Sequence, residues 1–261
     1  MIDYAGKTTL ITGGASGIGK ALAQALKARG AAVIIADINE ANLKTAAAEI
    51  GPGTHTIACD LADPAAPARL LDQAHAATGR LDLICSNAGI GHRRRLAKEN
   101  FDESELKRLF EVNLFAGLRL AQLYLEKLSA TNARGRILFT ASENSLSVPA
   151  AIKGSGLALY AATKHALLIA AEWLRDECAN APLDVHVLMP GAVYTPLIAA
   201  RLPDPSMAPP ALDLIMPEQC AERALNGMDL SLFYIPTQPH LLADMQPRLE
   251  AMKASLKALQ L

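Results

Sequence analysis

The sequence predicts an α/β fold, a doubly wound parallel sheet flanked by helices. Short apolar runs alternate with longer helical segments from the N-terminal residues to about residue 190. The runs show little polar alternation, which is typical of strands covered on both faces. The chain has 261 residues, of which 51% are hydrophobic, enough for the core of one such domain. It contains no repeat or low-complexity linker, so we expect residues 1–261 to form a single Rossmann-like domain.

The expected elements follow one another in a regular order. Buried strands are predicted at residues 8–11, 32–36, 56–58, 81–85, 136–140 and 185–189. Segments rich in Ala, Leu, Glu and Lys predict helices between them, among them 20–29, 41–50, 103–128 and 157–179. Repeated strand–helix units need right-handed crossovers, so the strands are expected to run parallel.

The C-terminal part of the chain departs from this order. Residues 196–217 contain six prolines, which prevent one long helix. We interpret the region of about 196–228 as a lid over a site, because long irregular connections in compact domains are usually functional or disordered. Residues from about 247 to 261 have apolar side chains at helical spacing and predict a helix docked on the core or on a second subunit. Its basic residues leave a membrane-surface helix as an alternative.

Composition argues against several classes of protein. The formal net charge is −1, which argues against a nucleic-acid partner. The four cysteines are scattered, so neither a disulfide framework nor a metal site is expected, and a reducing compartment suits them. The N-terminus shows no signal segment, and no apolar run approaches the roughly 20 residues that span a bilayer. We therefore expect a cytoplasmic protein without a membrane partner.

A glycine-rich turn follows the first predicted strand and leads directly into a helix. Gly13, Gly17 and Gly19 form a three-glycine pattern whose first gap is wider than in GxGxxG. Glycine permits the tight turn, the approach of a pyrophosphate to the backbone, and close packing of the helix on the sheet. The N-terminus of this helix, with Ser16 and Ile18 between the glycines, offers free N–H groups to phosphates. The turn therefore predicts a dinucleotide site.

Asp37 ends the second predicted strand, about 20 residues after the turn. A carboxylate at this position accepts hydrogen bonds from the ribose hydroxyls of NAD and repels the 2′-phosphate of NADP. The neighbouring residues supply no positive charge; they are Ala15, Ser16, Ile38 and Asn39. NAD is therefore the expected cofactor, with Asp37 and Ile38 at its ribose. The alternative is that Asp37 only caps the following helix.

Tyr160 and Lys164 lie one turn apart on the same face of a predicted helix. The ordinary pKa of tyrosine, about 10, is too high for a base at neutral pH. A nearby ammonium and an oxidised nicotinamide would both favour the phenolate and lower this pKa. Taken alone, the pair would also fit a solvated surface helix.

The order of these motifs over residues 5–195 resembles that of the short-chain dehydrogenase/reductase family. The shared positions are residues 12–19, Asp60-Leu61, Asn87-Ala88-Gly89, Asn113, a serine near residue 142, Tyr160 to Lys164, and Pro190 to Thr195. The resemblance implies further cofactor contacts: Asp60 and Leu61 at the adenine, Asn87, Ala88 and Gly89 along the cleft, and Pro190, Gly191, Val193 and Thr195 at the nicotinamide end. A last strand is doubtful, because only a short apolar run at residues 232–235 remains for it.

The same resemblance implies the catalytic roles. Tyr160 would exchange a proton with the substrate oxygen as a hydride moves to or from the cofactor, and Lys164 would also hold the nicotinamide ribose. Asn113 would relay a proton through water behind Lys164. The alternative for Asn113 is a polar residue that only kinks or caps a helix.

Three serines compete for the role of holding the substrate oxygen and stabilising its developing charge. Ser142 is preferred because it ends the fifth predicted strand and so lies beside the cleft. Its separation from Tyr160 is longer than in the family pattern. Ser145 and Ser147 are therefore rival assignments, with Ser147 at the usual spacing.

The sequence thus predicts an NAD-dependent oxidoreductase that acts on a secondary alcohol or ketone. The alternative is an NAD(H)-binding sensor without useful turnover. The apolar lid favours a hydrophobic substrate, whereas Arg93-Arg94-Arg95 could bind a carboxylate or phosphate or simply be solvated. The helices expected at residues 103–128 and 157–179 could form a symmetric interface, so a homo-oligomer, dimer or tetramer, is expected.

Overall fold

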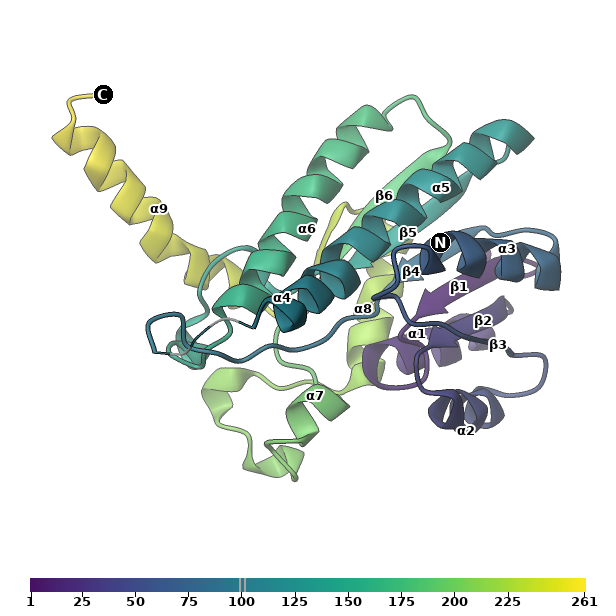
Figure 1. The fold of residues 1–261 in the computed structure, drawn as a ribbon. Coiled ribbons are helices and arrows are strands. Elements are labelled where there is room, and N and C mark those ends of the chain that lie inside the picture. The colour runs from purple at the N-terminus through teal and green to yellow at the C-terminus, as the bar shows by residue number, and fades with distance from the viewer. Residues whose placement is uncertain (99, 101) are drawn as a thin grey trace.

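A seven-stranded sheet forms the centre of the computed structural model, which describes residues 1–98, 100 and 102–261 (Figure 1). The strands are β1 (Thr8–Thr12), β2 (Ala32–Asp37), β3 (His55–Ala58), β4 (Leu83–Ser86), β5 (Gly135–Thr140), β6 (Leu183–Met189) and β7 (Tyr234–Pro236). Their order in the sheet is β3-β2-β1-β4-β5-β6-β7, and every neighbouring pair is parallel. The predicted doubly wound α/β fold is confirmed.

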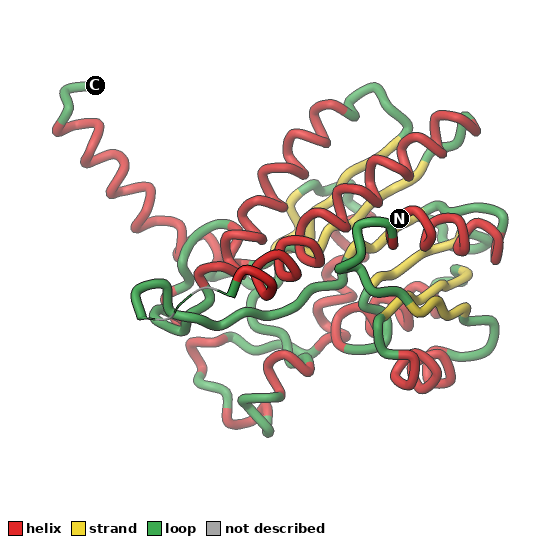
Figure 2. Tube along the Cα trace, viewed as in Figure 1, coloured by secondary structure: helices red, strands yellow, loops and turns green. Residues whose placement is uncertain are grey.

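Helices cover both faces of this sheet (Figure 2). One face packs against α3 (Ala66–Thr78), α5 (Ala116–Thr131) and α6 (Ala158–Glu177), and the other against α1 (Gly17–Ala28), α2 (Glu40–Ile50) and α8 (Pro217–Asp229). Ile34 and Ile35 are adjacent on β2, are both fully buried, and belong to opposite cores. Because alternate residues of a strand point to opposite faces, two covered faces leave no position for polar alternation.

The strand order reverses between β1 and β4, which are neighbours in the sheet although β2 and β3 intervene in sequence. In open α/β sheets, ligands bind outside the carboxyl ends of the strands at such a reversal. Here β1 ends at Thr12 and β4 ends at Ser86. The glycine-rich turn and the loop that begins at Asn87 therefore leave the sheet next to each other.

The doubtful last strand exists and extends the sheet. Residues of β7 pair in parallel with β6, with Tyr234 opposite Val187 and Ile235 opposite Leu188. Ile235 is 2% exposed and packs tightly on Gly227 of α8, where a Cβ would lie 2.6 Å from the isoleucine side chain. The close approach of α8 gives a three-residue strand enough burial to be stable, which no local pattern in the sequence indicates.

The long helix expected at residues 103–128 is interrupted. It consists of α4 (Glu103–Phe110), a π-helical turn at Glu111–Phe115, and α5. Single π-turns within helices occur frequently at functional sites. This turn contains Asn113, whose side chain is discussed below.

The predicted start of the C-terminal helix is wrong. We expected a helix from about residue 247, but α9 (Leu241–Ala258) begins six residues earlier and contains Pro247 in its interior. Leu241 is buried in the core and anchors the first turn there. Most of the remaining helix is exposed, and it projects away from the sheet (Figure 1).

The predicted end of the lid, at about residue 228, is also wrong. As the prolines predict, residues 196–216 form short pieces only: α7 (Pro196–Ala199) and two 3-10 turns, Pro205–Met207 and Pro210–Leu212. The residues that follow form α8, which packs against α1 and buries four side chains completely: Cys220, Ala221, Ala224 and Leu225. Because α8 is a core helix, we use the name lid for residues 196–216 alone.

None of the described helices combines the length and apolarity that crossing a bilayer requires. All four cysteines are free, and three of them are buried.

Candidate active site

A cavity of about 1000 Å³ lies at the carboxyl ends of the strands. It is lined by the ends of β2 and β5, by the segments that directly follow β1, β4 and β6, and by the lid. It collects nearly all the residues that the sequence singles out. Those on its wall are Gly13, Ser16, Gly17, Ile18, Asp37, Ile38, Asp60, Leu61, Asn87, Ala88, Gly89, Ser142, Tyr160, Lys164, Pro190, Gly191, Val193 and Thr195. Gly19 and Asn113 lie behind this wall. One cavity thus joins the expected cofactor residues to the expected catalytic residues.

The glycine-rich turn has two kinds of glycine. Gly13 and Gly17 have positive φ angles of 64° and 51°, which side chains rarely adopt. At Gly19 the limit is space, since a Cβ would lie 2.2 Å from the carbonyl oxygen of Gly13. Ser16 precedes α1 in an extended conformation, and its side chain makes no capping bond within the described chain. The first N–H groups of α1 and the Ser16 hydroxyl are therefore free to bind a phosphate.

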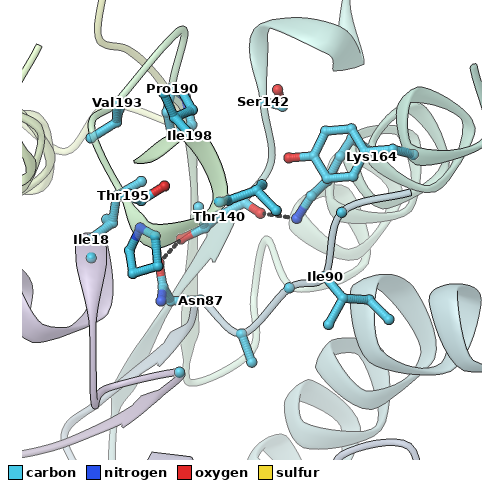
Figure 3. A pocket seen from close by; sticks show the side chains of 18 of the residues that line it. Ile18, Asn87, Ile90, Thr140, Ser142, Lys164, Pro190, Val193, Thr195 and Ile198 are labelled. Carbon is cyan, nitrogen blue, oxygen red and sulfur yellow. Dashed lines mark hydrogen bonds between the residues drawn. The ribbon is translucent and has the colours of Figure 1, made fainter. Parts of the chain in front are cut away.

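Asn87 connects the ends of three strands. Its backbone N–H and that of Ala88 both donate to Thr12 Oγ1 at 3.0 Å, and its side-chain Nδ2 donates to Thr12 O at 3.1 Å. Its Oδ1 accepts a hydrogen bond from Thr140 Oγ1 at 3.2 Å (Figure 3). These bonds join β1, β4 and β5 at the floor of the cavity and fix the position of the backbone there.

Asp37 is held by backbone donors at the end of β2. Its Oδ2 accepts from Ala15 N at 3.3 Å, and its Oδ1 accepts from Asn39 N at 3.1 Å. The capping alternative does not apply, because α2 is capped by Asn39, whose side chain accepts from Asn42 N. The Asp37 carboxylate therefore faces the cavity at a fixed position.

Asp60 has a partner that sequence reasoning missed. Both of its oxygens accept from the guanidinium of Arg108 on α4, at 3.3 and 3.2 Å, and Oδ1 also accepts from Ala62 N at 2.9 Å. Arg108 lines the same cavity. An adenine amino group at this position would have to share the carboxylate with Arg108.

Lys164 is buried beneath Tyr160 on α6. Its side chain is 3% exposed, its Nζ donates to Thr140 O at 2.8 Å (Figure 3), and Nζ lies 5.8 Å from the centre of the Tyr160 ring. Burial lowers the pKa of Lys164 to about 8. Since an ammonium has three donors, two remain after the bond to Thr140.

Tyr160 is more strongly desolvated than the sequence suggests. Burial raises the pKa of Tyr160, a hydrogen bond with Ser142 lowers it, and the nearby Glu143 carboxylate raises it further. The net shift is upward, contrary to the lowering that we expected from a neighbouring ammonium. The phenol is therefore the resting form of Tyr160 at neutral pH, and phenolate formation needs further positive charge in the cavity.

The three candidate serines differ in their surroundings. Ser142 Oγ accepts from both the backbone N–H and Nδ2 of Asn144, each at 3.2 Å. Its hydroxyl proton is therefore left to donate to the Tyr160 oxygen or to a substrate oxygen in the cavity. Ser145 bonds back to the Ser142 N–H at 3.2 Å, and neither Ser145 nor Ser147 is among the described residues that line the cavity. The geometry favours Ser142.

Asn113 bonds to a neighbouring loop and not to its own helix. Its Oδ1 accepts from Ile90 N at 2.8 Å, and its Nδ2 donates to Ile90 O at 3.0 Å and to Thr163 Oγ1 at 3.2 Å. A Cβ placed on Gly89 would lie 3.5 Å from both Asn113 Oδ1 and Lys164 Nζ. The missing side chain of Gly89 therefore leaves room between the amide oxygen and the ammonium.

The C-terminal segment contributes two residues that sequence reasoning missed. Gln238 is 4% exposed; its Oε1 accepts from Gly191 N at 2.7 Å, and its Nε2 donates to Ala192 O at 3.0 Å. A Cβ on Gly191 would lie 2.7 Å from this Oε1, so a larger residue there would displace the Gln238 side chain. His240 Nε2 lies 2.8 Å from Oε2 of Glu143. No local signal reveals contacts between residues so far apart in sequence.

Glu143 and His240 affect each other's protonation. Burial raises the pKa of Glu143, although the hydrogen bond to His240 lowers it. Burial lowers the pKa of His240, but the hydrogen bond and charge of Glu143 outweigh it, together with the charges of Asp244 and Asp213, and raise it overall. The two side chains form a hydrogen-bonded pair beside Ser142 that joins the segment after β5 to the C-terminal segment.

The chain matches the family model described as short chain dehydrogenase over residues 7–205. It is 34% identical over 245 residues to the 1-deoxy-11-beta-hydroxypentalenate dehydrogenase of Streptomyces avermitilis, covering 93% of this chain and 87% of that protein.

Two solved structures are similar over nearly their whole length. A short chain dehydrogenase/reductase from Burkholderia phymatum in complex with NAD gives a TM-score of 0.84 at 23% identity and covers 98% of this chain and 97% of that one. A short-chain dehydrogenase from Sphingobium yanoikuyae in complex with NADPH gives 0.77 at 22% identity, covering 97% and 95%. At these identities the likeness shows the fold alone, and proteins with this fold bind either nicotinamide cofactor.

Proposed function

The chain belongs to the short-chain dehydrogenase/reductase family, and we propose that it is an NAD-dependent oxidoreductase that moves a hydride between nicotinamide and a secondary alcohol or ketone. One observation carries the proposal: Ser142, Tyr160 and Lys164 line the same cavity as the glycine-rich turn. The cavity can therefore hold a pyrophosphate at one end and a substrate oxygen at the other. The Streptomyces relative is likewise named as a dehydrogenase of a hydroxylated compound.

Tyr160 and Ser142 perform the proton chemistry at the substrate oxygen. Bound oxidised nicotinamide supplies a hydride acceptor and a positive charge. That charge and the Lys164 ammonium oppose the burial that raises the pKa of Tyr160. The Tyr160 oxygen then takes the proton of the substrate hydroxyl in oxidation and returns it to the carbonyl oxygen in reduction. The Ser142 proton, which faces the Tyr160 oxygen in the resting site, can donate to the same substrate oxygen and stabilise its negative charge.

Lys164 and Asn113 can pass the proton on. At neutral pH the pKa of about 8 keeps most of Lys164 in the ammonium form. One of its free N–H groups can donate to a ribose hydroxyl and the other to a water beside Gly89. Asn113 Oδ1 has a second lone pair that can accept from that water. The fixed amide of Asn113 thus supports a route from Tyr160 towards solvent.

The position of Asp37 favours NAD over NADP. Its carboxylate is held at the end of β2 by two backbone N–H groups and lines the cavity. Ser16 and Ile38 beside it are uncharged. A 2′-phosphate at this position would meet a fixed negative charge without a compensating cation from these neighbours, whereas two ribose hydroxyls would find an acceptor.

We also propose a homo-oligomer that uses α6. Ile169 and Trp173 lie one turn apart on this helix and are 52% and 66% exposed. Large apolar side chains exposed together on a helix are a common feature of protein interfaces. Light scattering that gave the mass of a monomer would contradict this part of the proposal.

The function is tested by following NADH absorbance with a panel of secondary alcohols and ketones, with NAD and NADP in parallel. Tyr160→Phe keeps the ring but removes the exchanging proton, so we expect turnover to fall about a thousandfold. NAD binding, measured by calorimetry, should be nearly unchanged.

Persistent turnover in the Tyr160→Phe variant would contradict the assignment of Tyr160. Equal turnover with NADP would contradict the role of Asp37. Tight NADH binding without turnover of any panel member would instead favour the sensor.

A further inference from the structure

Two arginines from distant parts of the sequence line the same cavity. Arg93 belongs to the loop after β4, and Arg201 belongs to the lid, two residues after α7. Burial lowers the pKa of Arg93, and the charge of Arg201 on the same cavity wall lowers it further. The function proposed above gives neither arginine a role.

The backbone on both sides of Arg93 is held by contacts with other segments. On the Arg93 loop, Gly91 touches the lid, since a Cβ there would lie 2.6 Å from Cδ1 of Leu197. On the other side of Arg93, Arg94 N donates to Gly156 O at 2.9 Å. Gly156 is only four residues before Tyr160. These contacts place Arg93 between the lid and the start of α6, on the substrate side of the cavity.

No carboxylate of the described residues neutralises the two arginines. Arg94, next in the chain, pairs with Glu105, with its Nε 3.0 Å from Oε2. Across residues 1–98, 100 and 102–261, no acidic side chain lies within 4.0 Å of the guanidinium of Arg93 or Arg201. Two unneutralised cations that repel each other gain stability when an anion binds between them. A guanidinium fork fits a carboxylate or a phosphate.

The cavity that holds the two arginines and Tyr160 also has a large apolar wall. Its apolar side chains come from the loop before α6 and from the lid: Ile152, Leu157, Leu197, Ile198, Leu202 and Leu212. A substrate that bridges both features needs an apolar body with a charged end.

We propose, on the basis of the oxidoreductase function above, that the substrate is an amphipathic acid. Its alcohol or ketone carbon lies at Tyr160, its apolar body lies along the lid, and its carboxylate or phosphate binds between Arg93 and Arg201. The two sequence signals that point to different substrates, the apolar lid and the arginine run, then describe two parts of one molecule. The pyrophosphate of the cofactor has its own donors at the start of α1, and Asp37 marks the ribose end, so the arginines serve the substrate.

The test compares alicyclic ketones that carry a carboxylate at increasing distance from the carbonyl, each matched with its neutral methyl amide. For the best acid, we expect kcat/KM in the unmodified protein to exceed that of its amide about 100-fold. Arg93→Ala and Arg201→Ala should each lower kcat/KM for the acid about 10- to 100-fold, as expected for a charge-assisted hydrogen bond. Turnover of the amide should change by less than about twofold.

Two further variants sharpen the result. Arg93→Lys keeps the charge but loses the fork, so it should fall between Arg93→Ala and the unmodified protein. Arg134→Ala is the matched control, because Arg134 is a surface residue paired with Asp184 away from the cavity. It should behave as the unmodified protein. The KM for NAD should stay constant throughout.

Three outcomes would overturn the proposal. Equal turnover of acid and amide would remove the acid requirement while leaving the oxidoreductase function intact. A raised KM for NAD in Arg93→Ala, with the acid preference kept, would assign the arginines to cofactor phosphates.

If no ketone is turned over, acid and amide binding to the NADH-bound protein is measured by calorimetry. Binding of acids that requires Arg93 and Arg201 would then still support the anion site, and equal binding of the amides would reject it.

Discussion

The cofactor end and the substrate end of the cavity are built in different ways. At the cofactor end, the residues lie at the carboxyl ends of strands or in the turns after them, and the ligand contacts come largely from backbone N–H groups and glycines, as in residues 12–19. At the substrate end, side chains meet from segments far apart, such as Glu143 with His240. The first design fixes one ligand by backbone geometry. In the second, residues of the lid and the C-terminal segment can be substituted to suit a different substrate without altering the cofactor site.

Among the variants that test this comparison, Gly19→Ala at the cofactor end is expected to have the largest effect on NADH binding and stability. The added Cβ would lie 2.2 Å from a backbone oxygen of Gly13 and 2.6 Å from Nδ2 of Asn87, so the turn must shift. We expect NADH binding to weaken at least about 100-fold and the free energy of unfolding to fall by about 3 kcal/mol. Calorimetry and urea unfolding measure the two quantities.

Gly79→Ala is the matched control. Gly79 also has a positive φ, of 75°, but a Cβ there meets no described atom within 4 Å. This variant should lose about 1 kcal/mol through backbone strain alone and bind NADH normally. Equal effects of the two variants on NADH binding would show that close packing at Gly19 does not shape the cofactor site.

A smaller effect is expected from Gln238→Leu, where a side chain of the C-terminal segment holds the loop after β6. The change leaves the N–H of Gly191 and the carbonyl of Ala192 without the partners described above. The Gly191 N–H keeps Thr237 Oγ1 and the Ala192 carbonyl keeps the Ile215 N–H as partners. We therefore expect a loss of about 2 kcal/mol in the free energy of unfolding, measured by urea denaturation, because two buried hydrogen bonds worth about 1 kcal/mol each are lost. Gln246→Leu, on the exposed face of α9, serves as the control and should cost far less. An unchanged stability in Gln238→Leu would mean that other groups hold this loop.

The smallest expected effect is on how stability depends on pH, through the Glu143–His240 pair. Because the pKa of His240 is raised in the folded protein, protonated His240 stabilises the fold. This contribution is complete below the ordinary pKa of histidine and is lost as pH rises through the higher folded value. Unfolding measured at a series of pH values from about 6 to 9 should therefore show a decline that His240→Gln reduces. The same decline in both proteins would assign the pH dependence to other groups.

How much the sequence could predict depends on the distance between interacting residues. Six strands, the glycine-rich turn and Asp37 follow from local patterns, because burial on both sheet faces and tight turns constrain residue types directly. The start of α9 and the true end of the lid were misplaced because burial decided them. Leu241 packs into the core and α8 packs on α1, and both contacts arise from distant segments.

The sequence by itself determined the parallel sheet, the turn that can hold a dinucleotide, and the spacing of Tyr160 and Lys164, since each rests on neighbours along the chain. Only the tertiary structure decided that Ser142 faces the cavity, that burial raises the pKa of Tyr160, and that β7 completes the sheet. It alone brought Arg93 and Arg201 to one cavity wall. Desolvation and long-range contacts depend on which segments fold against one another, and this information is spread over the whole chain.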